Sequence, residues 1–111
     1  MEIRLTEQDG ISILEISGRM DATSTPEFEN TVRDLPAQTP LLLMDMSGLE
    51  YISSAGLRGI LGLVKAFRAA SGKLAFCALQ PMVAEVFRIS GFTAMLTVRD
   101  SREEAVTALR G

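Results

Sequence analysis

Histidine is absent from this 111-residue chain, and its absence excludes several classes of function at once. Serine and cysteine nucleophiles that rely on a histidine base, histidine-ligated metal sites and phosphohistidine relays all need a side chain that the sequence lacks. A serine in this chain has no histidine to take its proton. We therefore expect no catalytic residue, no bound metal and no cofactor, and a self-contained hydrolase is disfavoured.

Cysteine and long apolar runs are also scarce. The single Cys77 cannot form an internal disulfide, and its apolar neighbours in KLAFCAL predict a buried structural thiol. No apolar run approaches the roughly 20 residues that span a bilayer, and the N-terminus resembles no signal peptide. We expect a cytoplasmic chain without membrane insertion. The net charge of −3 lacks the basic footprint of nucleic-acid binding, so no nucleic-acid partner is expected.

The residues that are present describe an ordinary globular domain. Hydrophobic residues make up 47% of the chain and charged residues 23%, a balance that favours one folded domain over residues 1–111. The hydrophobic periodicity and the turn residues predict nine elements in the order β-β-α-β-α-β-α-β-α. The expected strands cover residues 2–6, 11–17, 41–46, 73–79 and 94–98, and the expected helices begin near Ser24 or Thr25, Ser54, Pro81 and Ser101.

Strands that alternate with helices indicate an α/β fold with a mixed, mostly parallel sheet and helices packed around it. Asp9-Gly10 is a hairpin turn signal, so the first two strands are expected to form an antiparallel hairpin at the sheet edge. Residues 18–24 and 47–53 are expected to be connections. Asp45 and Ser47, at the end of the third expected strand, are interpreted as turn-forming rather than catalytic residues.

The helix expected over residues 54–71 has two contrasting faces. At 100° per residue, its apolar face contains Leu57, Ile60, Leu61, Val64 and Phe67. The opposite face contains Ala55, Gly59, Gly62 and Ala66, although each interior glycine costs a helix roughly 1 kcal/mol. This face is either buried against another backbone, simply tolerated, or a flat exposed surface for a partner protein. In the last case Arg58 and Lys65 would lie along one side.

Two serines stand where this helix begins, in the segment YISSAGLRGIL. Ser53 or Ser54 is expected to act as an N-cap, the commonest use of serine at such a position. A phosphate on Ser54 would also be favourable there, because free backbone N–H groups and the helix dipole attract negative charge. Asp21, in the loop GRMDATS, is expected to stabilise a turn unless the fold brings it near Ser54.

These residues resemble the STAS domain family, and within it the bacterial anti-sigma factor antagonists. GRMDATS is similar to the family's G-x-x-D loop, and DMSGLEYISSAGLRGIL is similar to its central D-[LM]-S-x-[LV]-x-[YF]-[IM]-[DS]-S-x-G-L segment. KLAFCAL, RISGF and EEAVTAL match later elements in order and spacing. The resemblance covers nearly the whole chain and implies a single STAS domain.

The resemblance also implies a switch. An unphosphorylated antagonist would bind an anti-sigma factor that is itself an ATP-dependent serine kinase, and phosphorylation by that kinase would release it. Ser54 falls on the family's acceptor position, Asp21 on the nearby loop acid and Gly56 on the glycine that follows. Ser53 replaces the aspartate of many members and is a competing acceptor.

The partner surface is accordingly expected to comprise Asp21, Ser53, Ser54, Ala55, Gly56, Arg58, Gly59 and Gly62. ATP would be bound by the partner, a phosphatase is a further candidate partner, and a monomer is expected. The alternative function is an accessory STAS subunit of a membrane lipid-transport complex, which would need no phosphorylation cycle.

Overall fold

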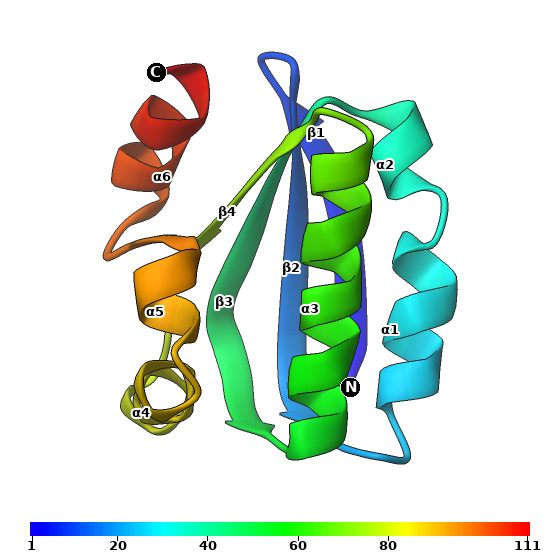
Figure 1. The fold of residues 1–111 in the computed structure, drawn as a ribbon, viewed down its shortest axis with the longest axis vertical. Helices are drawn as coiled ribbons and strands as arrows, with labels where there is room; N and C mark the ends of the chain where they lie inside the picture. Colours follow the sequence, from blue (N-terminus) through cyan, green and yellow to red (C-terminus); the bar gives the residue numbers. More distant parts are fainter.

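The computed structural model of residues 1–111 contains a five-stranded sheet whose strands lie in chain order (Figure 1). The expected antiparallel hairpin is confirmed, and the remaining strand pairs are parallel. Asp9 and Gly10 both have positive φ, at 53° and 82°, as a tight two-residue hairpin turn requires. The strands are β1 (Glu2–Gln8), β2 (Ile11–Met20), β3 (Leu41–Ile52), β4 (Lys73–Cys77) and β5 (Thr97–Arg99).

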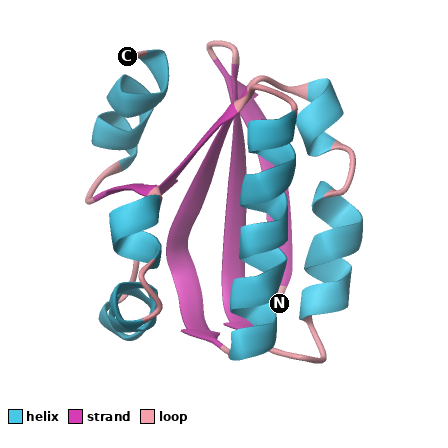
Figure 2. Ribbon diagram, viewed as in Figure 1, coloured by secondary structure: helices cyan, strands magenta, loops and turns pink.

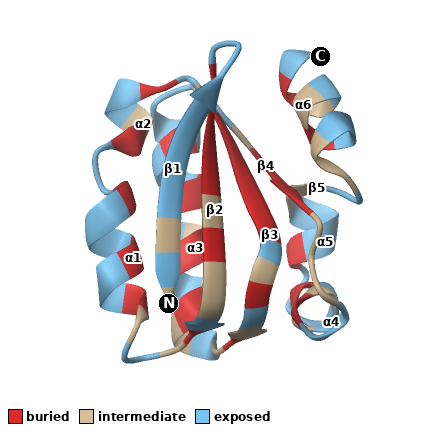
Figure 3. Ribbon diagram, turned by 180° about the vertical axis from the view of Figure 1, so that it is seen from behind, coloured by how far each residue is buried: buried red, intermediate tan, exposed pale blue.

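The chain also contains six helices, most of which pack on one face of the sheet (Figure 2). They are α1 (Thr25–Val32), α2 (Leu35–Gln38), α3 (Ser54–Ala69), α4 (Pro81–Ile89), α5 (Phe92–Met95) and α6 (Arg102–Arg110). The long helix α3 lies across one face of the sheet, with α1 and α2 along its side (Figure 1). Seen from behind, β1, β2 and much of β3 are not covered by any helix (Figure 3).

The interior consists of two apolar clusters separated by the sheet. The larger cluster has 19 buried residues and joins the sheet to α1, α3 and α4, with Phe28, Phe67 and Phe87 among its largest members. The smaller cluster has seven and is covered by Ala105 and Leu109 of α6. Cys77 belongs to this second cluster, which confirms the expected buried thiol, and burial raises its pKa to about 11.

Both strands that lead to the candidate site are longer than the sequence indicated. β2 continues to Met20 and β3 to Ile52, so the connections expected at residues 18–24 and 47–53 begin inside strands. The pairing is interrupted by register shifts between Glu15 and Ser17 and between Gly18 and Arg19. Such irregularities break the alternating pattern on which the strand prediction depended, although the backbone pairing continues past them.

Two short helices were not expected. α2 follows α1, and α5 occupies the first part of the region predicted as a strand over residues 94–98. The last strand is therefore only the three residues Thr97–Arg99. A four-residue helix contains about one turn, too short to show helical periodicity in a sequence.

Asp45 is not a turn residue, as the sequence had suggested, but a buried residue within β3. Its carboxylate accepts hydrogen bonds from Arg102 of α6 at 2.5 Å and from the Ser47 backbone N–H at 2.9 Å. Burial opposes its ionisation, but these donors outweigh burial and hold the pKa of Asp45 below its ordinary value. The pair fastens the start of α6 to the centre of the sheet.

Asp45→Asn is expected to lower the free energy of unfolding by about 1–3 kcal/mol at pH 6, because Arg102 loses its charged acceptor. Since the pKa of Asp45 is lowered on folding, its contribution is present above the ordinary value of 3.8 and is lost as the pH falls through the folded value. Thermal unfolding between pH 6 and pH 2.5 should therefore show the two proteins converging in acid. Asp34→Asn, at an exposed carboxylate without an ion pair, is the matched control. A difference that stays constant with pH would contradict this role.

Candidate modification and partner-binding site

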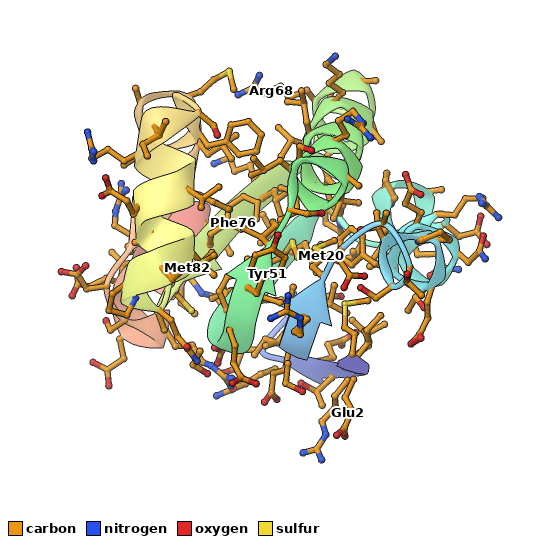
Figure 4. All side chains as sticks on the ribbon, turned by 90° about the horizontal axis from the view of Figure 1, so that it is seen from below. Glu2, Met20, Tyr51, Arg68, Phe76 and Met82 are labelled. Carbon is orange, nitrogen blue, oxygen red and sulfur yellow. The ribbon has the colours of Figure 1, made fainter.

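The two serines lie where the carboxyl ends of β2 and β3 meet the start of α3. The Ser53 backbone N–H donates to the Met20 carbonyl oxygen at 2.9 Å, which joins the helix start directly to the end of β2. Viewed from this end of the molecule, Met20 and Tyr51 lie next to each other at the ends of their strands (Figure 4). The edge of an α/β sheet at which parallel strands end is the usual location of functional groups.

Ser53 and Ser54 have different environments. Ser53 is the N-cap: its backbone is extended, with φ −95° and ψ 176°, and its hydroxyl accepts the Gly56 backbone N–H at 3.3 Å. Ser54 is the first residue of α3, and its side chain is exposed with no hydrogen-bond partner in the protein. The capping role expected for one of the two serines therefore belongs to Ser53. Ser54 presents a free hydroxyl at the positive end of a four-turn helix.

Asp21 organises the loop beside this helix start. Its carboxylate accepts the backbone N–H groups of Thr23 and Ser24, each at 3.0 Å. The Ser24 hydroxyl accepts the Asp21 N–H at 2.9 Å and donates to the Arg19 carbonyl oxygen at 2.8 Å. The bond from the Ser24 N–H, more than any other contact, holds the pKa of Asp21 below its ordinary value. The expected turn-stabilising role is confirmed, and the Met20–Ser53 bond brings the loop to the start of α3.

The small face of α3 is not the flat exposed surface considered from the sequence. Gly56 is buried, and a Cβ there would lie 2.8 Å from the Met20 carbonyl oxygen. Gly59 is also buried, and its Cβ would lie 2.9 Å from Cγ2 of Thr25 in α1. These two glycines let β2 and α1 come close to α3. Of the small face defined from the sequence, Gly59 is the buried member, and at this position the alternative of burial against another element is the correct one.

Further along α3, toward its C-terminal end, the small face is exposed to solvent. Gly62 is exposed, and a Cβ there would meet no atom within 4 Å. It borders a groove of about 510 Å³ between α3 and the α1–α2 segment, which Ala66 also lines. Arg58 is exposed and Ala55 is half-buried. Of the eight residues of the predicted partner surface only Gly56 and Gly59 are buried, and the other six are exposed or half-buried.

One feature at this end escaped the sequence analysis. The guanidinium carbon of Arg19 lies 4.1 Å from the centre of the Tyr51 ring, a stacked cation–π pair between β2 and β3. Arg19 is exposed and Tyr51 is half-buried. The two residues are 32 positions apart by number and become neighbours only through the shifted register of the strands. Only the tendency of the guanidinium to stack on aromatic rings could have hinted at this pair.

The site contains no arrangement that could hold a metal. Nowhere in the chain do three or more cysteine, aspartate or glutamate side chains gather in a way that could ligate an ion. None of the helices has the length and apolar character needed to cross a membrane. What the site offers is one free hydroxyl, exposed cations and a helix N-terminus.

Comparison with known proteins identifies the family to which this fold and motif belong. The model of the STAS domain family matches residues 2–105. The chain belongs to the STAS domain family. This confirms the resemblance drawn from GRMDATS and the segment around Ser54, and it agrees with the observed sheet and hairpin.

Several relatives of this STAS domain are named for one function. BtrV of Bordetella bronchiseptica, a candidate anti-sigma factor antagonist, is 36% identical over 99% of this chain and 96% of its own length. The crystal structure of an anti-sigma factor antagonist from Mycobacterium paratuberculosis has a TM-score of 0.90 at 22% identity, covering 99% of this chain and 94% of that one. The phosphorylated form of SpoIIAA, a Bacillus cell-fate determinant, has a TM-score of 0.74 at 18% identity, covering 98% and 100%.

The different environments of the two serines predict different effects on the stability of the STAS domain. Ser53→Ala removes the cap and should lower the free energy of unfolding by about 1 kcal/mol. Ser54→Ala removes an unbonded hydroxyl and should change it by less than about 0.5 kcal/mol. Urea unfolding of the two variants and the wild type measures both effects. Equal losses, or a larger loss for Ser54→Ala, would show that the capping assignment is wrong.

Proposed function

We propose that this STAS domain is an anti-sigma factor antagonist whose binding is switched by phosphorylation of Ser54. The observation that carries the proposal is the contrast between the two serines: Ser53 is held as the helix cap, whereas Ser54 is exposed and unbonded. The names of the relatives support the class of partner. The unphosphorylated domain would bind an anti-sigma factor and so free the sigma factor.

Ser54 is the better acceptor for a geometric reason. A kinase must place the acceptor hydroxyl against the γ-phosphate, and an exposed hydroxyl at the tip of a helix can be reached without breaking any bond of the fold. Phosphorylating Ser53 would break the hydrogen bond that its hydroxyl accepts from the Gly56 N–H, and it would introduce charge at a half-buried position. Ser53 is thus the minor, competing site.

A phosphate on Ser54 would act on the partner rather than on the fold. The positive end of α3 favours the added charge of about −1.5 to −2, so the domain should remain folded. At an interface centred on Ser54 the same charge would have to be desolvated and would repel acidic groups of the partner. A coupling of about 3 kcal/mol, at the upper end of the usual range, corresponds to roughly hundredfold weaker binding.

The chemistry of the switch belongs to the partner. With no histidine in the chain and no metal cluster, the domain acts as the substrate of an ATP-dependent serine kinase and not as an enzyme. The anti-sigma factor would itself be this kinase and would carry the ATP. A phosphatase would reset the switch. In this proposal the domain works in the cytoplasm as a monomer.

A pull-down from the source cells with wild-type and Ser54→Asp baits tests the switch. Wild-type bait should capture an ATPase-like kinase, and the aspartate should reduce its recovery because the added carboxylate carries part of the charge of a phosphate. Quantitative mass spectrometry of the captured proteins gives the ratio. Ser71→Asp, the same substitution two residues beyond the opposite end of α3, is the matched control and should capture the kinase like wild type.

Phosphate mapping on the recovered pair identifies the acceptor. With ATP added, Ser54→Ala should abolish most phosphate incorporation, whereas Ser53→Ala should retain it. If Ser53 carries the phosphate instead, the acceptor assignment is wrong. If wild type and Ser54→Asp both capture one permease or transport ATPase, the domain is an accessory transport subunit.

A further inference from the structure

A second hollow lies at the other end of α3, remote from the serines. It encloses about 310 Å³ between the last turns of α3, the start of β4, the α5–β5 segment and α6. Eight of its twelve lining residues are hydrophobic, among them Phe67 of α3, Leu74 and Phe76 of β4, and Ala108 and Leu109 of α6. This size and lining lie at the lower end of the range typical of small-molecule sites.

The hollow exists because the sheet is incomplete at this corner. β5 pairs only with Ala75, Phe76 and Cys77, so the first two residues of β4, Lys73 and Leu74, have no neighbouring strand on that side. The unpaired corner borders apolar side chains from both faces of the sheet. Met95, at its rim, remains 46% exposed.

The charge at the mouth of this hollow is of one sign. Arg68 and Lys73 line it, and no aspartate or glutamate does. Four other hollows of the surface each contain at least one acidic residue in their lining, as expected for a chain with 14 acidic and 11 basic residues. This hollow differs from those four in that all its charged lining residues are basic.

A hydrogen bond holds the Arg68 side chain at the edge of the hollow. The side chain extends from α3 toward α5 (Figure 4) and donates one N–H to the Met95 carbonyl oxygen at 3.2 Å. A guanidinium has five N–H donors, so this bond fixes its position and leaves donors for an anion. Neither Arg68 nor Lys73 forms an ion pair with a carboxylate of the chain.

From the eight hydrophobic residues and the two cations that line this hollow, we infer that it binds a small amphiphile with an aliphatic chain and a carboxylate head, such as a medium-chain fatty acid. The chain occupies the hollow beside Leu74, Leu96 and Ala108, which are half-buried residues of its lining. The carboxylate lies at the mouth, where Arg68 and Lys73 supply charged donors. The site goes beyond the proposed phosphorylation switch and does not rest on it. Along α3, Ser54 and Arg68 are separated by about 20 Å.

Titration with sodium decanoate below its micellar concentration, followed by calorimetry and by amide NMR shifts, tests the site. Binding should saturate at one molecule per chain, with shifts confined to residues around the hollow. Each methylene group added from hexanoate to decanoate should tighten binding about fourfold until the hollow is full. Decanol, which lacks the charge, should bind about tenfold more weakly than decanoate.

Matched variants separate this site from general adsorption of a surfactant. Lys73→Met should weaken decanoate binding about tenfold, whereas Lys65→Met, on an exposed face of α3 outside the hollow, should leave it unchanged. Ala108→Leu should fill the hollow and abolish binding, with Ala69→Leu, an exposed residue outside the hollow, as its control.

The inference is overturned if decanoate fails to bind saturably or if the NMR shifts scatter over the surface. It is also overturned if decanol binds as tightly as decanoate, because the two cations would then play no part. These measurements need no phosphorylation and no partner protein. Failure of the kinase experiments would leave them unaffected.

Discussion

The close contact between the start of α3 and the end of β2 is the constraint on which this structure depends. Gly56 has no room for a side chain, since a Cβ would lie 2.8 Å from the Met20 carbonyl oxygen. That same oxygen accepts the Ser53 N–H at 2.9 Å. One carbonyl thus fixes both the position and the direction of the helix start. Ser53 must cap the helix in this geometry, and Ser54 is left pointing outward.

The surroundings of this contact strengthen it. Asp21 ties its loop together with two backbone N–H bonds, and the loop leads directly into α1. Thr25, the first residue of α1, then packs on Gly59 one turn along α3. Gly56 and Gly59 allow this packing at the serine end, and Gly59 and Gly62 line the groove between α3 and α1. A phosphate on Ser54 would therefore lie on a closely packed helix start, which suits a switch that changes surface charge without changing the fold.

The sequence predicted the parts of this arrangement that follow from periodicity and local turn chemistry. The hairpin at Asp9-Gly10 and the serine cap were recoverable because each depends on neighbours in the chain. The extension of β2 and β3, the Arg19–Tyr51 stack and the Asp45–Arg102 pair were not recoverable. Each depends on strand register or on contacts between distant elements, and the register shifts near Ser17 and Gly18 hide them from pattern analysis. Gly59 also could not be explained from the sequence. Its spacing identified an unusual glycine inside a helix, but only the position of α1 shows that a side chain would not fit there.

In the proposed switch, one phosphate on Ser54 controls binding while the fold stays intact. The most direct measurement is the affinity of the captured anti-sigma factor for the domain with and without a single phosphate, in a Ser53→Ala background so that the phosphate can sit only on Ser54. Calorimetry gives both affinities, and thermal unfolding of the two forms shows whether the fold is preserved. If the switch operates, the phosphorylated form should bind roughly hundredfold more weakly and unfold at nearly the same temperature. Equal affinities, or a loss of binding explained by unfolding, would contradict it.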